Sequence, residues 1–412
     1  MSLERLAAVR EEARELASRF AADGYRIYLV GGIVRDAMLG LPLDAAFDLD
    51  LTTDAQPPAV KSILDSWADT LWTQGERFGT IGARRGNRRI EITTHRTERY
   101  QPGSRKPDVA FADAIEADLS RRDFTINAMA VELPDGDLVD PFGGTDDLAK
   151  GLLRTPLDPE ETFSDDPLRM LRAARFLAQF KLAAEPPLMA AMAAMADRLS
   201  IVADERIRDE LDRVLALPNP LSGFGLMFET GLAERVLGVS GDGSSALERV
   251  SRAGQDPIAR LAALLADIGT PADAQSALEE RRAPTAVGRA VFTVLTAAGR
   301  AVAQPPRTLP ELRRWVVDAG DSVDQSVAVA SVLGEVGALA ADVAALMEAE
   351  PDLGGPLVLD GDEIMALLEL EPGPEVGAAV DELRRHRLDS GPLSPEEARE
   401  HLLDWSNLPP PS

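Results

Sequence analysis

A glycine pair followed by an aspartate pair is the feature that most constrains this chain. Residues 28–36 read Tyr28-Leu-Val-Gly-Gly-Ile-Val-Arg-Asp36, and a second apolar segment carries Asp48 and Asp50. The pattern predicts a strand that runs into Gly31 and Gly32, then a short helix, then a second strand. Glycine lets the backbone approach a ligand closely, and the amides at a helix start bind anions, so this turn suits a triphosphate.

The two aspartates are spaced for a shared metal site. Asp48 and Asp50 are two residues apart, so on a strand both side chains project from one face. A pair of carboxylates suits Mg²⁺. Glu91, on a later strand, could add a third carboxylate or could pair with an arginine across the strands. Each motif alone is consistent with an ordinary turn or a solvated strand end, but together they predict two-metal nucleotidyl transfer.

Composition limits the class of protein. The 412 residues are 45% apolar, enough for two or three domains with substantial cores. We find no apolar run long enough to span a bilayer, and charge begins at Glu4, so neither a membrane span nor a secretory signal is expected. The chain has no cysteine, which excludes disulfides and thiolate metal sites and fits a cytoplasmic protein.

Charge is uneven along the chain. The formal net charge of −26 argues against nonspecific nucleic-acid binding by the whole surface. Residues 77–106 are an exception, with nine basic residues against two acidic ones. The basic residues of this basic strip are Arg77, Arg84, Arg85, Arg88, Arg89, Arg96, Arg99, Arg105 and Lys106. The strip could contact phosphates or could be a solvated hairpin edge. Its polar end, residues 96–108, is expected to be a mobile loop.

A second motif reads Leu119-Ser-Arg-Arg-Asp-Phe-Thr-Ile-Asn-Ala-Met129. Arginines such as Arg122 offer a fork of donors for phosphate. Asp123 and Asn127 are four residues apart, which predicts one helical face able to hold ribose hydroxyls. A capped helix would explain the string equally well.

A third motif, Asp165-Asp-Pro-Leu-Arg-Met-Leu-Arg-Ala-Ala-Arg-Phe176, places acids at a predicted helix start, where the macrodipole favours them. Helix capping with ion pairs is the plain interpretation. Asp166 and Arg169, three residues apart, are also predicted to share a helical face.

These motifs, in this order, resemble the bacterial class of the tRNA nucleotidyltransferase and poly(A) polymerase family. The resemblance implies an α+β fold with a nucleotidyltransferase head of mixed sheet and helices over residues 1–150. An all-helical neck for nucleobase recognition (151–225) and an RNA-binding helical body and tail (226–412) would follow. The implied activity is template-independent addition of CMP and AMP (CCA) to the 3′ end of tRNA, with CTP and ATP as substrates, Mg²⁺ as cofactor and no DNA partner.

The resemblance also implies roles for individual residues. Asp48, Asp50 and Glu91 would be catalytic, with Asp48 and Asp50 as metal ligands. The nucleotide would be bound by Gly31, Gly32, Arg35, Arg122, Asp123, Asn127, Asp166, Arg169, Arg172 and Arg175. Asp166 and Arg169 align with the family's base-contacting acid and arginine, and an acceptor beside a donor would match the amine and unprotonated ring nitrogen that cytosine and adenine share. A later helical motif, Glu205–Leu211, would support the site through structural charges.

One further segment, residues 260–271, resembles a worn metal-dependent phosphohydrolase signature. That signature needs a histidine directly before Asp267, where this chain has Ala266. The chain has only three histidines, too scattered for such a metal centre. We therefore predict a degenerate HD-like domain without hydrolase activity.

Other functions remain open from sequence. Enzymes that add only C, only A or a poly(A) tail share all of these motifs. A small-molecule nucleotidyltransferase is less consistent with the third motif and the long helical remainder. A catalytically inactive RNA-binding protein is less consistent with the intact pair Asp48 and Asp50.

Overall fold

The structure is a computed structural model that describes residues 3–43, 48–99 and 108–407. The tip of the loop expected to be mobile, residues 100–107, lies outside the described residues. The chain divides into two compact units, Met1–Asp242 and Gly243–Ser412. Each unit is described on its own, and the division into three parts at residues 150 and 225 stays a prediction.

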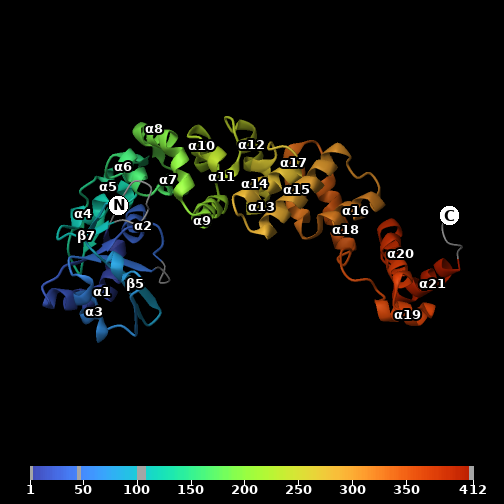
Figure 1. Cartoon of the computed structure of the whole chain (residues 1–412), viewed down its shortest axis with the longest axis horizontal. Helices are drawn as coiled ribbons and strands as arrows, with labels where there is room; N and C mark the ends of the chain where they lie inside the picture. The colour runs from blue at the N-terminus through green and yellow to red at the C-terminus, as the bar shows by residue number, and fades with distance from the viewer. Residues whose placement is uncertain (1–2, 44–47, 100–107, 408–412) are drawn as a thin grey trace. The chain divides into compact units, whose positions relative to one another are not determined.

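A seven-stranded mixed sheet forms the base of the first unit (Figure 1). Its strands are β1 (Ile27–Val30), β2 (Leu49–Thr53), β3 (Thr70–Trp72), β4 (Thr80–Arg85), β5 (Arg88–Thr94), β8 (Ala130–Glu132) and β9 (Leu138–Val139). Their order is β3-β4-β5-β2-β1-β8-β9, with β2 parallel to β5 and the other neighbours antiparallel. The predicted mixed sheet of the head is confirmed.

Helices lie on both faces of this sheet. They are η1 (Leu3–Leu6), α1 (Ala7–Ala22), α2 (Gly32–Leu39), α3 (Pro57–Asp65), η2 (Glu76–Phe78), α4 (Ile115–Ser120), η3 (Thr125–Asn127) and α5 (Gly144–Lys150). Helix α1 covers the face that carries Leu49 and Ile90, because it lines one cavity with them. Tyr28 pairs with Thr52, so both share the opposite face with Asp50, and Tyr28 packs there against α4.

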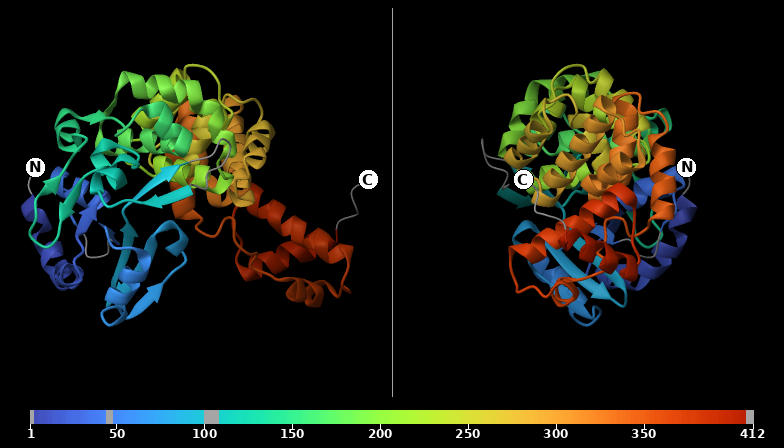
Figure 2. Two further views of the ribbon diagram at one scale, coloured as in Figure 1. Left: turned by 60° about the vertical axis from the view of Figure 1, so that its left-hand side comes forward. Right: turned by 90° about the vertical axis from the view of Figure 1, so that its right-hand side faces the viewer.

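Two short ladders lie outside this sheet. Strands β6 (Arg96–Arg99) and β7 (Asp108–Phe111) form an antiparallel pair, drawn in cyan and teal in Figure 2. Strands β10 (Leu152–Leu153) and β11 (Ala183–Ala184) form a parallel pair. The sequence predicted an almost wholly helical chain from Leu152, and two-residue strands are too short for hydrophobic periodicity to reveal.

The remaining helices of the first unit are α6 (Pro159–Asp165), α7 (Arg169–Phe180), α8 (Pro186–Met195), η4 (Ala196–Ile201), α9 (Asp204–Leu215), α10 (Leu221–Glu229) and α11 (Leu232–Leu237). The prediction that Asp166 and Arg169 share a helix is wrong. Asp166 lies between α6 and α7 with extended backbone, at φ −139° and ψ 102°. Pro167 follows it, and a residue before proline is disfavoured in helical conformation.

The predicted helix through Asp123 and Asn127 is also not formed. Only the three residues of η3 are helical, and Phe124 is extended at φ −137° and ψ 152°. The two side chains nevertheless meet, because Asn127 Nδ2 donates to Asp123 Oδ1 at 2.9 Å. A turn thus brings together the groups that a helix was expected to align.

In the second unit, the described residues form helices and no strands (Figure 2). The helices are α12 (Ser244–Arg252), α13 (Pro257–Leu265), α14 (Pro271–Glu280), α15 (Thr285–Ala303), α16 (Leu309–Ala319), η5 (Gly320–Ser322), α17 (Val323–Leu333), α18 (Leu339–Ala349), α19 (Gly361–Leu368), α20 (Pro374–Ser390) and α21 (Pro395–Ser406). Proline opens several of them, and capping boxes begin α14, α16, α19 and α21. The predicted helical remainder is confirmed.

Helix α15 corrects one expectation. It has 19 residues with a mean hydropathy of 1.3 in its most apolar window, so by length and composition it could cross a membrane. In the structure it packs among α13, α14, α16 and α17. Val291, Val294 and Ala298 are fully buried there. This is the environment of a core helix, and the core helices of soluble proteins can be as long and apolar as a membrane span.

Candidate active site

A cleft of about 470 Å³ in the first unit gathers the three sequence motifs. Its walls are Gly31, Gly32, Arg35, Asp50, Arg121, Arg122, Asp123, Asn127, Asp166, Arg169, Arg172, Arg175, Phe176 and Arg206. Every residue predicted to bind nucleotide is among them. Of the three predicted catalytic carboxylates, only Asp50 lines the cleft directly. The volume is in the range of small-molecule and cofactor sites.

The glycine turn brings the backbone close to two guanidinium groups. Gly31 has φ +74° and ψ −134° at the start of α2, a conformation that favours glycine. A Cβ on Gly31 would lie 3.2 Å from Arg122 Nη1, and one on Gly32 would lie 3.4 Å from Arg35 Nη2. Glycine therefore keeps space between backbone amides and two guanidinium groups, as a phosphate site requires.

Asp50 and Glu91 lie on neighbouring strands, and Asp48 directly precedes β2. Asp50 pairs with Glu91 in the parallel register of β2 and β5, so both side chains project from one face. Arg89 Nη2 lies 2.8 Å from Glu91, and Arg89 Nε lies 3.7 Å from Asp48. Glu91 thus stands beside Asp50 and also pairs with an arginine, so the structure is consistent with both interpretations of this residue.

Protein atoms crowd the carboxyl group of Asp50, although its side chain is open to solvent. This desolvation raises the pKa of Asp50, Arg122 opposes it, and Glu91 and Asp48 raise the pKa further. The residue therefore sits among like charges that a bound cation would relieve. A raised pKa in a cleft is typical of functional carboxylates.

The donor set fits a metal that is shared with substrate. Among the described residues, no group of three His, Cys, Asp or Glu side chains could hold a metal ion by itself. Mg²⁺ typically takes one or two protein carboxylates and completes its shell with substrate phosphates and water. Asp48 and Asp50 beside the cleft provide such a pair.

A buried hydrogen-bond chain connects the glycine turn to α7. Arg35 Nη1 donates to Asn127 Oδ1 at 2.6 Å, and Asn127 donates to Asp123. Arg172 Nε and Nη2 donate to Asp123 Oδ2 at 2.8 and 2.6 Å. Burial opposes ionisation of Asp123, but Arg172 and Asn127 outweigh it and lower its pKa to about 2. Asp123 is therefore a fixed anion that organises this wall.

The third motif enters the cleft in spite of the helix break. Asp166 Oδ1 accepts from the Leu168 amide at 3.1 Å, and Asp166 Oδ2 accepts from Arg206 Nη2 at 2.8 Å. Arg169 Nη2 donates to the Arg121 carbonyl at 2.6 Å. A carboxylate and a guanidinium each have further hydrogen-bonding capacity, so both side chains can also bind a ligand.

Arg175 and the Glu205–Leu211 motif form a supporting layer. Arg175 Nε donates to Glu210 Oε2 at 2.7 Å, and the Glu210 side chain is only 4% exposed. Arg213 Nη1 lies 2.9 Å from Glu210 Oε1. The expected structural role of this motif is thus consistent with its contacts, although Arg206 reaches the cleft itself.

Four residues of this region were not among the site residues predicted from the sequence, although Arg121 lies in the second motif. Arg121, Phe176 and Arg206 line the cleft, and the buried Asp118 holds Arg121 and Arg122. Two signals could have found them. Asp118 precedes the two arginines by three and four residues, a spacing that favours ion pairs, and Arg206 lies inside a motif already noted.

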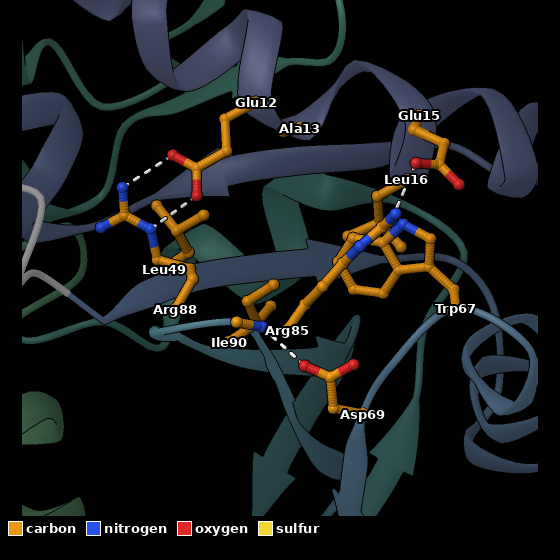
Figure 3. Close-up of a pocket in the computed structure, with 11 residues that line it drawn as sticks. Glu12, Ala13, Glu15, Leu16, Leu49, Trp67, Asp69, Arg85, Arg88 and Ile90 are labelled. Carbon is orange, nitrogen blue, oxygen red and sulfur yellow. Dashed lines mark hydrogen bonds and ion pairs between the residues drawn. The ribbon is translucent and has the colours of Figure 1, made fainter.

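The basic strip does not present all of its charge to solvent. Arg88 Nε and Nη2 donate to Glu12 at 2.7 Å each, and Arg85 Nη1 lies 2.8 Å from Glu15 (Figure 3). The Arg85 guanidinium also lies over the Trp67 ring, 4.6 Å from its centroid. These two arginines therefore join the β4–β5 hairpin to α1, a role that neither sequence interpretation included.

Two parts of the chain match known protein families. Residues 27–154 match the family described as "Poly A polymerase head domain", and residues 181–238 match "Probable RNA and SrmB- binding site of polymerase A". The CCA-adding enzyme of Limosilactobacillus fermentum is 40% identical over 233 residues, 56% of each chain. That of Lactobacillus johnsonii is 37% identical over 58% of this chain and 59% of its own. The chain thus spans little more than half the length of these curated relatives.

Solved structures are similar over more of the chain. The Bacillus stearothermophilus CCA-adding enzyme in complex with CTP has a TM-score of 0.75 at 25% identity, covering 96% of this chain and 97% of that one. The Thermotoga maritima CCA-adding enzyme complexed with tRNA has a TM-score of 0.73 at 21% identity, covering 99% of both, and supports the fold alone. Fold, motifs and relatives agree: residues 27–154 match the poly(A) polymerase head-domain family, and the chain is similar in fold to CCA-adding enzymes.

Proposed function

We propose that this protein adds CMP and AMP to the 3′ end of tRNA, using CTP and ATP without a nucleic-acid template. The observation that carries the proposal is the cleft, where the glycine turn, Asp50 and a wall of arginines converge. A triphosphate needs anion donors, and a transferred nucleotidyl group needs a metal-binding carboxylate beside them. The activity places the protein in the cytoplasm with tRNA.

The phosphate groups would lie at the glycine turn. Backbone amides at the start of α2, together with Arg35 and Arg122, offer donors on the side of the cleft nearest Gly31. Asp123 would accept hydrogen bonds from ribose hydroxyls, and Asn127 would donate to them. Arg172 holds Asp123 in place, and Asp123 is bonded to Asn127. Because this wall is already hydrogen-bonded, it needs little reorganisation when substrate binds.

Asp48 and Asp50 would hold Mg²⁺ together with the triphosphate. When bound, the metal lowers the pKa of the tRNA 3′-hydroxyl and neutralises charge on the leaving pyrophosphate. Glu91 would act beside them, and its ion pair with Arg89 limits the negative charge at this point. The pair of aspartates is therefore the catalytic centre of the proposal.

Base selection would fall to Asp166 and Arg169. An aspartate acceptor facing the exocyclic amine and an arginine donor facing the ring nitrogen match both C and A. Uracil and guanine would leave unpaired groups, at a cost of about 1–3 kcal/mol each in a dry pocket. Asp166 accepts a hydrogen bond from Arg206, and Arg169 donates one to the Arg121 carbonyl. These bonds would hold both side chains in a fixed orientation toward the base.

One assay tests the function and separates its alternatives. The purified protein is incubated with tRNA that lacks its 3′ terminus, and each labelled nucleotide is supplied alone and in mixtures. We expect two C additions followed by one A. Addition of C alone, of A alone or of an A tail would select another member of the family, and no addition would leave an inactive RNA-binding protein.

A further inference from the structure

Asp118 is a buried carboxylate that holds two arginines of the cleft. Its side chain is 0% exposed. Asp118 Oδ1 accepts from Arg121 Nε and Nη2 at 3.0 and 2.7 Å, and Oδ2 accepts from Arg122 Nη2 at 3.1 Å. Burial opposes ionisation, but the two guanidinium groups outweigh it and keep the pKa of Asp118 below its usual value. One fixed anion thus serves two cations.

The backbone that carries Asp118 is itself fixed. Ile115 and Leu119 flank it on α4 and pack with Tyr28 and Val30 of β1 in one buried cluster. Strand β1 is the strand that leads into the glycine turn. The carboxylate of Asp118 therefore has a fixed position relative to the backbone amides at which a triphosphate would bind.

The two arginines reach that same place. Arg121 and Arg122 line the cleft with Asp50 and Gly31, and Arg122 Nη1 would lie 3.2 Å from a Cβ on Gly31. Arg122 Nε is buried and has no hydrogen-bond partner among the described residues. The Arg122 guanidinium thus retains donor capacity beyond its bond to Asp118, and phosphate oxygens are the acceptors that suit such a donor.

We propose that Asp118 is a positioning residue, which presents Arg121 and Arg122 to the triphosphate of the incoming nucleotide. The inference rests on the proposed function. Two adjacent guanidinium groups repel each other, and long side chains lose rotamer freedom on binding. A buried counter-charge holds both side chains in place before substrate arrives. Without it, Arg122 could pair with the exposed Asp50, which would withdraw both groups from substrate.

The test is the near-isosteric change Asp118→Asn in the full chain. We expect the Kd for CTP to rise roughly tenfold or more, because charge-assisted hydrogen bonds hold the donors. The inhibition constant of cytidine, which has no phosphate, should stay unchanged. In a background of Arg121→Gln and Arg122→Gln, Asp118→Asn should not raise the Kd for CTP further. If Asp118→Asn damaged the cleft in general, the Kd would rise in this background as well.

Glu350→Gln is the matched control. Glu350 is a carboxylate whose side chain is 10% exposed and paired with the buried Arg313 in the second unit, so its loss should lower Tm without changing CTP affinity. If Asp118→Asn does not fold, Arg122→Gln tests the same step, and it should weaken binding of CTP but not of cytidine.

Wild type that binds neither CTP nor ATP would defeat the proposed function. Wild-type binding with unchanged CTP affinity in folded Asp118→Asn, or equal losses for CTP and cytidine, would overturn the positioning role alone.

Discussion

At the scale of single residues, the exposed pair of Asp50 on β2 and Asp48 directly before it is the most direct test of the chemistry. Asp50→Asn or Asp48→Asn keeps the shape of the side chain but removes a charged metal ligand. We expect nucleotide addition to fall roughly 10³-fold or more, since several kcal/mol of transition-state stabilisation depend on the metal. Asp54→Asn, just past the same strand and outside the cleft, should retain activity. Near-normal turnover in Asp48→Asn or Asp50→Asn would contradict the assignment of these residues as metal ligands.

Arg169 tests nucleotide choice at the same scale. Arg169→Ala should impair use of CTP and ATP and relax the exclusion of UTP and GTP, because the donor that matches the ring nitrogen is lost. The measurement is incorporation of all four nucleotides into tRNA. Arg198→Ala is a matched control, since Arg198 also donates to a backbone carbonyl, that of Ser164, but lies outside the cleft lining. Unchanged selectivity in Arg169→Ala would contradict the base-reading role and leave Arg169 with a structural role only.

At the scale of elements, the sequence predicted the strands and the cleft better than the helix boundaries. Period-two apolar patterns and the glycine turn identified β1, β2 and the β4–β5 hairpin, because these signals are local. The break at Asp166 was signalled by Pro167, but the regular spacing of the motif concealed it. Ion pairs between α1 and β5, such as Glu12 with Arg88, could not be predicted, because they depend on how two elements pack.

That packing gives a prediction for the basic strip. Arg88 is 13% exposed and makes a two-point ion pair with Glu12, so Arg88→Glu should cost about 1–2 kcal/mol of stability, more than an exposed pair. Tm should fall by a few degrees. The charge swap of Glu12→Arg with Arg88→Glu should recover most of the loss. Arg84→Glu, at an exposed position of the same hairpin, should leave Tm unchanged.

The opposite outcome would show that Arg88 contacts RNA. A normal Tm in Arg88→Glu, with weaker tRNA binding and a shallower dependence of affinity on salt, would make Arg88 a phosphate contact. The same salt titration on Arg84→Glu then measures how much of the strip meets RNA. Each lost phosphate contact should reduce the slope by roughly one unit.

At the scale of the whole molecule, the two units differ in what sequence could predict of them. The first unit carries local motifs whose residue types follow from their chemistry. All ten residues predicted to bind nucleotide line its cleft, whereas Arg121, Phe176 and Arg206 were not predicted. The second unit is built from helices that pack through apolar faces, with the last three in a buried cluster of their own, and it carries few chemical signals. Its helical content was predictable, but the pairing of its helices depends on side-chain packing that no local pattern encodes.

The second unit also gives the last prediction, that it lacks metal-dependent phosphohydrolase activity. Ala266, at the end of α13, cannot bind metal, and Asp267 is engaged by Arg249 Nη2 at 2.6 Å. Assays of 2′,3′-cyclic phosphate hydrolysis should show no stimulation by Ni²⁺ or Mn²⁺. Asp267→Asn should leave any background rate unchanged while loosening the contact between α12 and α13. Stimulated hydrolysis that disappears in Asp267→Asn would instead make Asp267 a metal ligand, and the second unit would then be a second enzyme.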